Sequence, residues 1–319
     1  MNTYRKELVP LIQNIEKVIV GKRQAITLTL VAMLSKGHVL LEDVPGVGKT
    51  MMIRALAKSI GVTFKRIQFT PDLLPSDLTG VSVYNPKTMS FEFRKGPIMG
   101  NIILADEINR TSPKTQAALL EAMEEGSVTV DGETMMLPKP HIVLATQNPI
   151  EYEGTYPLPE AQLDRFLIKM NLGYPTFDEE LELLNRSTHQ HPIETVEEVM
   201  SKETFIRLQN EVQQVHVDEA IKEYIVTLAQ ATRKNQFVRL GVSPRGSLAF
   251  MHATQALAYV LNRSYVIPDD VKFLAPYVMA HRLILTDEAR FQGITVERLI
   301  RTIIQKVPIP EQKVSAFDE

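Results

Sequence analysis

The stretch Leu40–Thr50, LLEDVPGVGKT, constrains the fold of this chain more than any other segment. An apolar run, His38–Glu42, leads into it, and the segment that follows, TMMIRALAKSIG, carries its apolar residues on one helical stripe. A strand that enters a glycine-rich turn and then a helix directs backbone N–H groups and the positive helix end at a phosphate. The sequence therefore predicts a phosphate-binding loop, with an ordinary strand-to-helix turn and an incidental lysine as the alternative.

One position departs from the phosphate-loop pattern G-x-x-x-x-G-K-[ST], because Asp43 stands where the first glycine is expected. Asp fits there with φ below zero, or in the left-handed region that it tolerates better than most residues. Gly46 and Gly48 let the backbone approach phosphate closely. Lys49 can reach the β- and γ-phosphates, and the Thr50 hydroxyl can bind Mg²⁺. ATP and Mg²⁺ are thus the expected ligands.

Composition indicates an ordinary globular protein of 319 residues, 44% hydrophobic and 23% charged, with a net charge of -3. This balance gives no global attraction for nucleic acid or an anionic membrane. The chain has no cysteine, which excludes disulfides and thiolate metal sites. No apolar run approaches the roughly 20 residues of a membrane helix, and the amino terminus lacks the pattern of a signal peptide. We expect a cytoplasmic protein without membrane insertion.

The first 175 residues alternate short apolar runs with helical patterns, which predicts an α/β domain with a parallel sheet between helices. The expected strands are 38–42, 64–69, 101–106, 141–146 and 166–172. Two hairpins interrupt the alternation, one turning at Asp131-Gly132 and a looser one at Asn85–Thr88. They are either surface decorations or functional insertions.

Residues 176–319 form a second predicted domain, in which strand signals fade and the pattern is helical throughout. Asp218 and Ser243 are the expected starts of two of its helices, since both residue types favour the N-cap. The expected helices are 178–188, 201–214, 218–234, 245–262 and 268–285.

Two further segments carry chemistry at predicted strand ends. In IILADEINR, Asp106 ends an apolar strand beside the loop, where it can hold the metal, and Glu107 can orient and deprotonate a water. In LATQNP, Asn148 can hydrogen-bond the γ-phosphate or that water. A solvated acidic pair and an Asn-Pro turn are the alternatives.

Two arginines are candidates for neutralising charge on the transferred phosphoryl group. They are Arg165 in LPEAQLDRF and Arg245 in VSPRGS. Considered singly, each would more often be a surface salt-bridge residue.

Six motifs in order resemble the MoxR-type AAA+ ATPases, relatives of the Mg-chelatase ATPase subunit, across nearly the whole chain: VIVGKRQA, EDVPGVGKT, ILADEINR, LATQNP, LPEAQLDRF and GVSPRGS. The resemblance implies an AAA+ αβα sandwich with a five-stranded parallel sheet and a C-terminal helical lid. It also implies a homo-oligomeric ring, usually a hexamer, and partners with von Willebrand factor A domains.

The resemblance also implies residue roles. Lys49 and Thr50 correspond to Walker A, and Asp106 and Glu107 to Walker B. Asn148 corresponds to sensor 1, Arg165 to a finger that enters a neighbouring subunit, and Arg245 to sensor 2 of the lid, acting in cis or in trans. Arg110 is a further candidate for an inter-subunit or phosphate contact. The remaining nucleotide-binding positions are Val20, Gly21, Pro45, Gly46, Val47, Gly48 and Met51.

The two hairpins correspond to the helix-2 insert and the pre-sensor-1 insertion of this group, which implies that they face the pore or upper surface of the ring. The leading hypothesis is ATP-driven remodelling or maturation of client proteins that the sequence does not identify. A nucleic-acid motor or transcription regulator is the alternative, although no helix-turn-helix, zinc module or GAFTGA loop is found. A scaffold that binds ATP and barely hydrolyses it is a third possibility.

Overall fold

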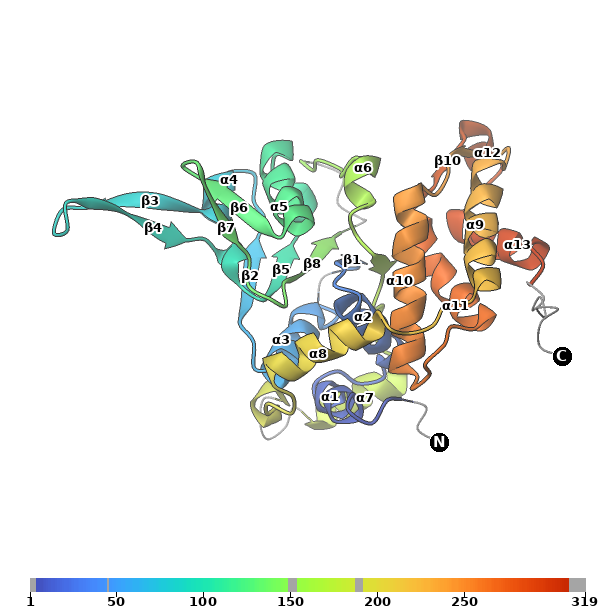
Figure 1. Ribbon diagram of the computed structural model, residues 1–319, viewed down its shortest axis with the longest axis horizontal. Helices are drawn as coiled ribbons and strands as arrows, with labels where there is room; N and C mark the ends of the chain where they lie inside the picture. The colour runs from blue at the N-terminus through green and yellow to red at the C-terminus, as the bar shows by residue number, and fades with distance from the viewer. Residues whose placement is uncertain (1–3, 45, 149–153, 187–191, 310–319) are drawn as a thin grey trace.

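A five-stranded parallel sheet lies at the centre of the amino-terminal part in the computed structural model (Figure 1). The structure describes residues 4–44, 46–148, 154–186 and 192–309. In spatial order the strands are β2 (Phe64–Gln68), β5 (Ile102–Asp106), β8 (Ile142–Gln147), β1 (Val39–Glu42) and β9 (Ile168–Met170). All five predicted strands and their parallel pairing are thus confirmed.

The central strands are buried on both faces, because successive residues point to opposite sides of a sheet. In β1, Val39 and Leu41 pack into one core with helices α2 (Arg23–Leu34) and α3 (Lys49–Ser59). Leu40, between them, packs into a second core that includes helix α5 (Pro113–Glu125). The sheet is therefore sandwiched between two helical layers, as the alternating pattern predicts.

Both predicted hairpins are present. Strands β3 (Gly80–Asn85) and β4 (Ser90–Lys95) form a long antiparallel arm that projects from the body at the left of Figure 1. Strands β6 (Ser127–Val130) and β7 (Glu133–Met136) form the shorter one. Its turn residues have φ of 52° at Asp131 and 84° at Gly132, the left-handed pair that a tight two-residue hairpin requires.

The carboxy-terminal part is helical, with two predicted starts confirmed. The Asp218 carboxylate accepts a hydrogen bond from Ala220 N at 2.8 Å, and Ser243 Oγ accepts one from Gly246 N at 3.0 Å. The helices are α7 (Phe177–Arg186), α8 (Lys202–Val212), α9 (Glu219–Arg233), α10 (Pro244–Val260), α11 (Pro268–Met279), α12 (Asp287–Phe291) and α13 (Val296–Lys306).

The helical part also contains a short antiparallel pair that the sequence pattern did not predict, β10 (Val238–Leu240) with β11 (Ile284–Leu285). Helix α11 ends at Met279 rather than continuing to 285, because a single helical turn and then β11 follow it. The short elements are α1 (Val9–Glu16), α4 (Pro75–Thr79), α6 (Glu160–Leu163) and the 3₁₀ turns η1 (Pro97–Met99), η2 (Ile108–Arg110), η3 (Pro192–Thr195) and η4 (Ala280–Arg282).

The two parts of the chain share one hydrophobic core. Gln209 of α8 donates a 2.7 Å hydrogen bond to the Met33 carbonyl of α2, and helix α10 packs against α2. The domain boundary at residue 175 stays a prediction. Within the described ranges, none of the helices combines the length and apolar character that crossing a membrane requires.

Candidate nucleotide site

The loop between β1 and α3 has the backbone shape of a phosphate cradle. Gly46 and Gly48 have φ of 87° and 93°, a region that disfavours residues with a Cβ atom. Helix α3 begins directly afterwards at Lys49, and no described side chain caps its first turn. Its first N–H groups and its positive end therefore remain available to an anion.

Asp43 has a structural task at the start of this loop. It is buried, and it is not among the described non-glycine residues with positive φ, so it meets the first of the two conformational conditions set above. Its carboxylate accepts hydrogen bonds from Leu172 N and, at 3.1 Å, from Gly173 N. The residue that replaces the first glycine thus ties the loop to the chain just after β9.

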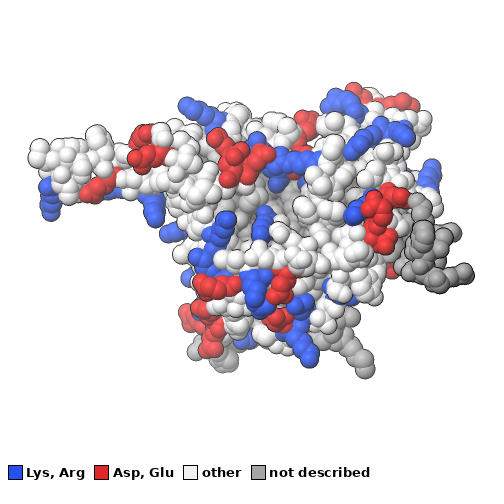
Figure 2. All heavy atoms as spheres, in the orientation of Figure 1, with Lys and Arg blue, Asp and Glu red and all other residues white. Residues whose placement is uncertain are grey.

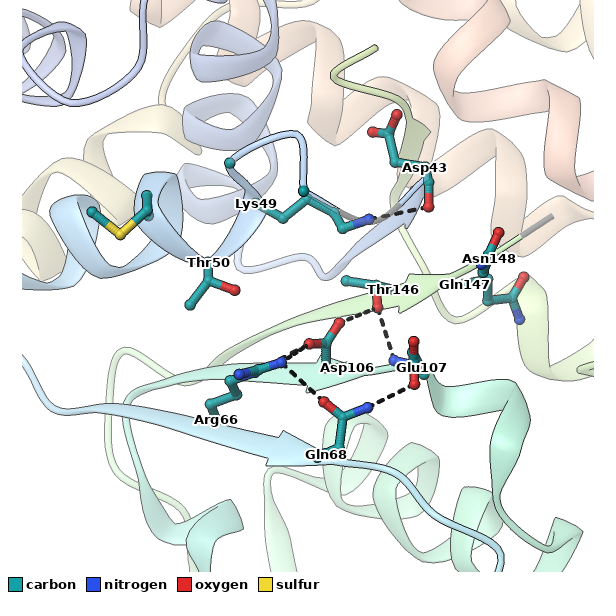
Figure 3. Close-up of a pocket in the computed structure, with 13 residues that line it drawn as sticks. Asp43, Lys49, Thr50, Arg66, Gln68, Asp106, Glu107, Thr146, Gln147 and Asn148 are labelled. Carbon is teal, nitrogen blue, oxygen red and sulfur yellow. Dashed lines mark hydrogen bonds and ion pairs between the residues drawn. The ribbon is translucent and has the colours of Figure 1, made fainter. Parts of the chain in front are cut away.

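Predicted residues from three separate segments line one cavity of about 340 Å³ beside the loop (Figure 3). Lys49 Nζ donates hydrogen bonds to the carbonyl oxygens of Asp43 at 3.1 Å and Val44 at 3.0 Å. Burial lowers the pKa of Lys49, and the nearby carboxylates of Asp43, Asp106 and Glu107 oppose that shift. The lining residues are Asp43, Gly46, Gly48, Lys49, Thr50, Met51, Arg66, Gln68, Asp106, Glu107, Thr146, Gln147 and Asn148.

Asp106 lies at the end of β5, between its two neighbouring strands. Thr146 Oγ1 of β8 donates to one carboxylate oxygen at 2.7 Å, and Arg66 Nη2 of β2 donates to the other at 2.6 Å. Hydrogen bonds to both oxygens fix the orientation of the carboxylate (Figure 3). Asp106 therefore faces the cavity from a defined position.

Glu107 follows in an uncommon backbone conformation, with φ of 59° and ψ of 49°. A non-glycine residue in the left-handed region costs about 1 to 3 kcal/mol and persists only where its surroundings hold it. Thr146 Oγ1 accepts a 2.8 Å hydrogen bond from Glu107 N, and Gln68 Nε2 donates to the Glu107 carboxylate at 2.7 Å. Arg110 Nε lies 3.4 Å from the same carboxylate. Strain of this kind clusters at functional sites.

Sequence reasoning missed Arg66, Gln68, Thr146 and Gln147 among these cavity residues. A signal for them exists, because Arg66 and Gln68 are two apart on one face of β2, and Gln68 is paired in register with Asp106. Thr146 comes one residue before the end of β8, the strand on the other side of β5. The carboxyl ends of parallel strands meet at one edge, which brings these polar residues together.

The remaining predicted nucleotide contacts that the structure describes, Val20, Gly21 and Val47, do not line this cavity. Val20 is buried, Val47 packs against the hydrophobic core, and Gly21 has a φ of 72°. The residue before Val20, Ile19, reaches the loop, since a Cβ atom on Gly48 would lie 3.0 Å from Ile19 Cδ1. Pro45 lies outside the described residues.

Arg165 and Arg245 lie at a different place from the other predicted residues. Both line a second cavity of about 200 Å³ that shares no lining residue with the first. The second cavity includes Gly37 and His38, which precede β1, whereas the phosphate loop follows β1. The two arginines therefore lie near the amino-terminal ends of the strands, whereas the phosphate loop of the same chain lies at the carboxyl ends.

The oxygen donors of the first cavity fit Mg²⁺. This ion takes one or two carboxylates together with substrate phosphates and water. The Thr50 hydroxyl and the Asp106 carboxylate both line the cavity and are hard oxygen donors of the kind Mg²⁺ prefers. Across the described residues no cluster of three or more metal-ligating side chains occurs, so the other ligands would come from phosphate and water.

The fold and the cavity together define an AAA-type nucleotide-binding protein, and comparison with known proteins agrees. Residues 38–168 match the ATPase family associated with various cellular activities (AAA), and residues 230–303 match the AAA lid domain. The segment between the two matches includes the predicted boundary at residue 175, which they leave open.

Full-length relatives narrow the class further. The chain is 44% identical over 306 residues to chaperone MoxR1 of Mycobacterium tuberculosis, covering 93% of this chain and 81% of that one. It is 30% identical over 328 residues to protein MoxR of Methylorubrum extorquens, covering 93% and 94%. It is 64% identical over 314 residues to YeaC of Bacillus subtilis, an uncharacterized protein, covering 97% and 98%. The chain belongs to the MoxR family of AAA ATPases.

A solved structure supports the same assignment. A crystal structure of a protein from Cytophaga hutchinsonii, described provisionally as an ATPase, matches with a TM-score of 0.91 and 42% sequence identity. The match covers 97% of this chain and 96% of that one. The predicted fold class, an AAA sandwich with a helical lid, is thus confirmed over nearly the whole length.

Proposed function

We propose that this chain hydrolyses ATP with Mg²⁺ between adjacent copies in a homo-oligomeric ring and uses the energy to remodel client proteins. One observation carries the proposal: the cavity joins the phosphate loop, Asp106, Glu107 and Asn148, while Arg165 and Arg245 lie at the far edge of the sheet. A chain so arranged presents a nucleotide site at one edge and a pair of arginines at the other. Head-to-tail copies would bring the two together.

Within the cavity each side chain has a distinct task. Lys49 and the first N–H groups of α3 hold the β- and γ-phosphates. Thr50 and Asp106 hold Mg²⁺, which supplies neutralisation of charge on the phosphates when bound. Glu107, held by the amide of Gln68, orients the attacking water and accepts its proton.

The chain's own cavity has a guanidinium, but it is already engaged. Arg66 donates to Asp106 from both Nε and Nη2, at 3.1 and 2.6 Å. Charge on the transferred phosphoryl group calls for an additional fixed cation. Arg165 and Arg245 of an adjacent copy are suited to supply it, which gives a physical reason for hydrolysis to depend on assembly.

The two hairpins are the proposed client contacts. On the β3–β4 arm, Tyr84 is 48% exposed, Met89 79% and Phe91 73%, and the Tyr84 and Phe91 rings meet edge to face at 5.5 Å. Figure 2 shows that atoms other than those of charged residues predominate on this arm. Met136 of the β6–β7 hairpin is 68% exposed. Apolar side chains displayed on projecting strands suit contacts with another polypeptide.

The name of one relative, chaperone MoxR1, supports remodelling as the process that ATP hydrolysis drives. We further propose a hexamer as the assembled form and proteins with von Willebrand factor A domains as partners. Both follow from the motif resemblance, and neither requires nucleic acid.

Substitution of Glu107 by Gln tests the hydrolysis. We expect this variant to bind ATP as the wild type does and to lose ATPase activity by about 100- to 10,000-fold, the range for a general base. Nucleotide binding measured by fluorescence and phosphate release measured on the same preparation separate the two. A wild-type assembly that binds ATP and releases no phosphate would support a nucleotide-gated scaffold instead.

A DNA-stimulated ATPase assay separates the proposal from a nucleic-acid motor. We expect no stimulation by single- or double-stranded DNA, since the net charge is -3 and Figure 2 shows acidic and basic side chains interspersed on the face it displays. Strong stimulation, with binding that weakens steeply as salt rises, would overturn the remodelling proposal.

A further inference from the structure

One carboxylate bridges the two arginines of the second cavity. Glu124 Oε2 lies 2.9 Å from Arg165 Nε, and Glu124 Oε1 lies 2.9 Å from Arg245 Nη1. Glu124 belongs to the last turn of α5, Arg165 follows α6, and Arg245 stands in the first turn of α10. Three distant segments of the chain thus converge on a single ion-pair cluster, which we call the Glu124 bridge.

We propose that Glu124 is a positioning residue. It holds Arg165 and Arg245 side by side so that both reach one phosphate of the nucleotide bound to an adjacent copy. This inference rests on the proposed function. Two guanidiniums at one place repel each other, and a carboxylate between them offsets that repulsion. One negative charge against two positive charges leaves the cluster net positive, so it still attracts a phosphate.

The bonding of Arg165 leaves capacity for a ligand. Its Nε–H is buried and finds no hydrogen-bond acceptor among the described residues, because the 2.9 Å approach to Glu124 lacks the geometry of a hydrogen bond. A guanidinium carries five N–H donors, and the closest approach to Glu124 is through Nε. The bridge therefore orients Arg165 without using all of its donors.

A second, buried network fixes the backbone that carries both arginines. Asp164 accepts a 2.6 Å hydrogen bond from Arg282 Nε and a 2.8 Å hydrogen bond from Ser243 Oγ. Asp164 precedes Arg165, and Ser243 comes two residues before Arg245. The Arg282 side chain is only 2% exposed and that of Asp164 20%, so most of this network is shielded from solvent. These hydrogen bonds thereby fix the position of the α6 segment relative to the helical part, next to the Glu124 bridge.

The bridge itself contributes little to folding. The side chains of Arg165, Arg245 and Glu124 are 27%, 48% and 35% exposed, and ion pairs that solvent reaches stabilise a fold only weakly. The buried network already joins the two segments. Glu124 is therefore better explained by the orientation that it gives to the arginines than by stability.

Substitution of Glu124 by Gln is the test, with Glu125→Gln as matched control, since Glu125 is an exposed glutamate in the same helical turn. We expect Glu124→Gln to lower kcat by about 10- to 100-fold, since a misplacement of about 1 Å can cost that much, and to leave KM and the melting temperature unchanged. Glu125→Gln should behave as the wild type.

A double-mutant cycle with Arg245→Ala separates positioning from a general structural effect. With one guanidinium removed there is no like-charge repulsion left to offset, so Glu124→Gln should lower kcat less than about twofold further. A loss of the same size in both backgrounds, or a Glu124→Gln variant equal to Glu125→Gln, would overturn the inference. Failure of the proposed function is distinct, since a wild-type assembly without ATPase activity would show it before any variant is compared.

Discussion

The two cavities lie at opposite ends of the strands of one sheet, and they are built in different ways. The nucleotide cavity takes its loop from consecutive residues, Gly46–Thr50, and its carboxylates from the end of β5. The arginine cavity is assembled from α5, the α6 segment and α10, which are far apart in the sequence. The first combines phosphate-loop residues and carboxylates within one chain, whereas the lining of the second has two arginines and none of the phosphate-loop residues. This difference is the basis of our proposal that the catalytic site is divided between copies.

The largest effect on the ATPase rate is expected from a change at the arginine cavity. Arg165→Ala should lower the ATPase rate of the assembly by about 10³- to 10⁵-fold, the range measured for arginine fingers, and leave ATP binding intact. Arg301→Ala, an exposed arginine of α13, is the control and should be active. If Arg165→Ala lost ATP affinity and rate together, the residue would be acting on binding rather than on the transition state.

A smaller effect is expected at the nucleotide cavity. Lys49→Ala should weaken ATP binding by about 10- to 100-fold, because a hydrogen bond to a charged group contributes about 1.5 to 3 kcal/mol. Titration of a fluorescent ATP analogue measures it, with Lys58→Ala at the other end of α3 as control. Tight binding by the Lys49 variant would refute the assignment of this loop as a phosphate cradle.

A third effect concerns His38, which lines the arginine cavity, and it depends on pH. Burial, together with the charge of His141, lowers the pKa of His38 to about 4. Val143 N donates to His38 Nδ1 at 3.0 Å, so Nε2 carries the proton and donates to the Met123 carbonyl. The folded state thus holds this imidazole neutral.

The direction in which stability changes with pH follows from that pKa. Between the ordinary value of 6.5 and about 4 the unfolded chain binds the proton and the folded chain does not, so stability falls as pH falls. Between pH 7 and pH 5 the loss from His38 should be about 2 kcal/mol. Urea unfolding at the two pH values measures it, and His38→Gln should flatten the dependence. An unchanged slope in that variant would show that other groups cause the loss.

Much of the nucleotide cavity could be predicted because its signals are local. The residues of the phosphate loop are consecutive in the sequence, and the composition of runs such as Ile102–Asp106 alone predicts a buried strand. Arg66, Gln68 and Thr146 escaped prediction because their contacts form between strands, and only the sheet order shows which strands are neighbours.

The arginine cavity could be predicted only in part. Arg165 and Arg245 were found as single candidates, but nothing in the sequence places them together or beside Glu124, because that contact depends on how the helical part packs on the sheet. The pair β10 and β11 was missed for a different reason. Strands of three and two residues are too short to show alternation.

The proposed division of the catalytic site between copies can be tested by mixing two inactive variants. Arg165→Ala chains keep Glu107, and Glu107→Gln chains keep Arg165, so a mixed assembly contains some sites with both residues intact. ATPase activity should rise well above that of either variant alone, after mass measurement has verified that mixed assemblies form. Mixed assemblies that stay as inactive as their components would contradict the account, since Arg165 would then act within its own chain.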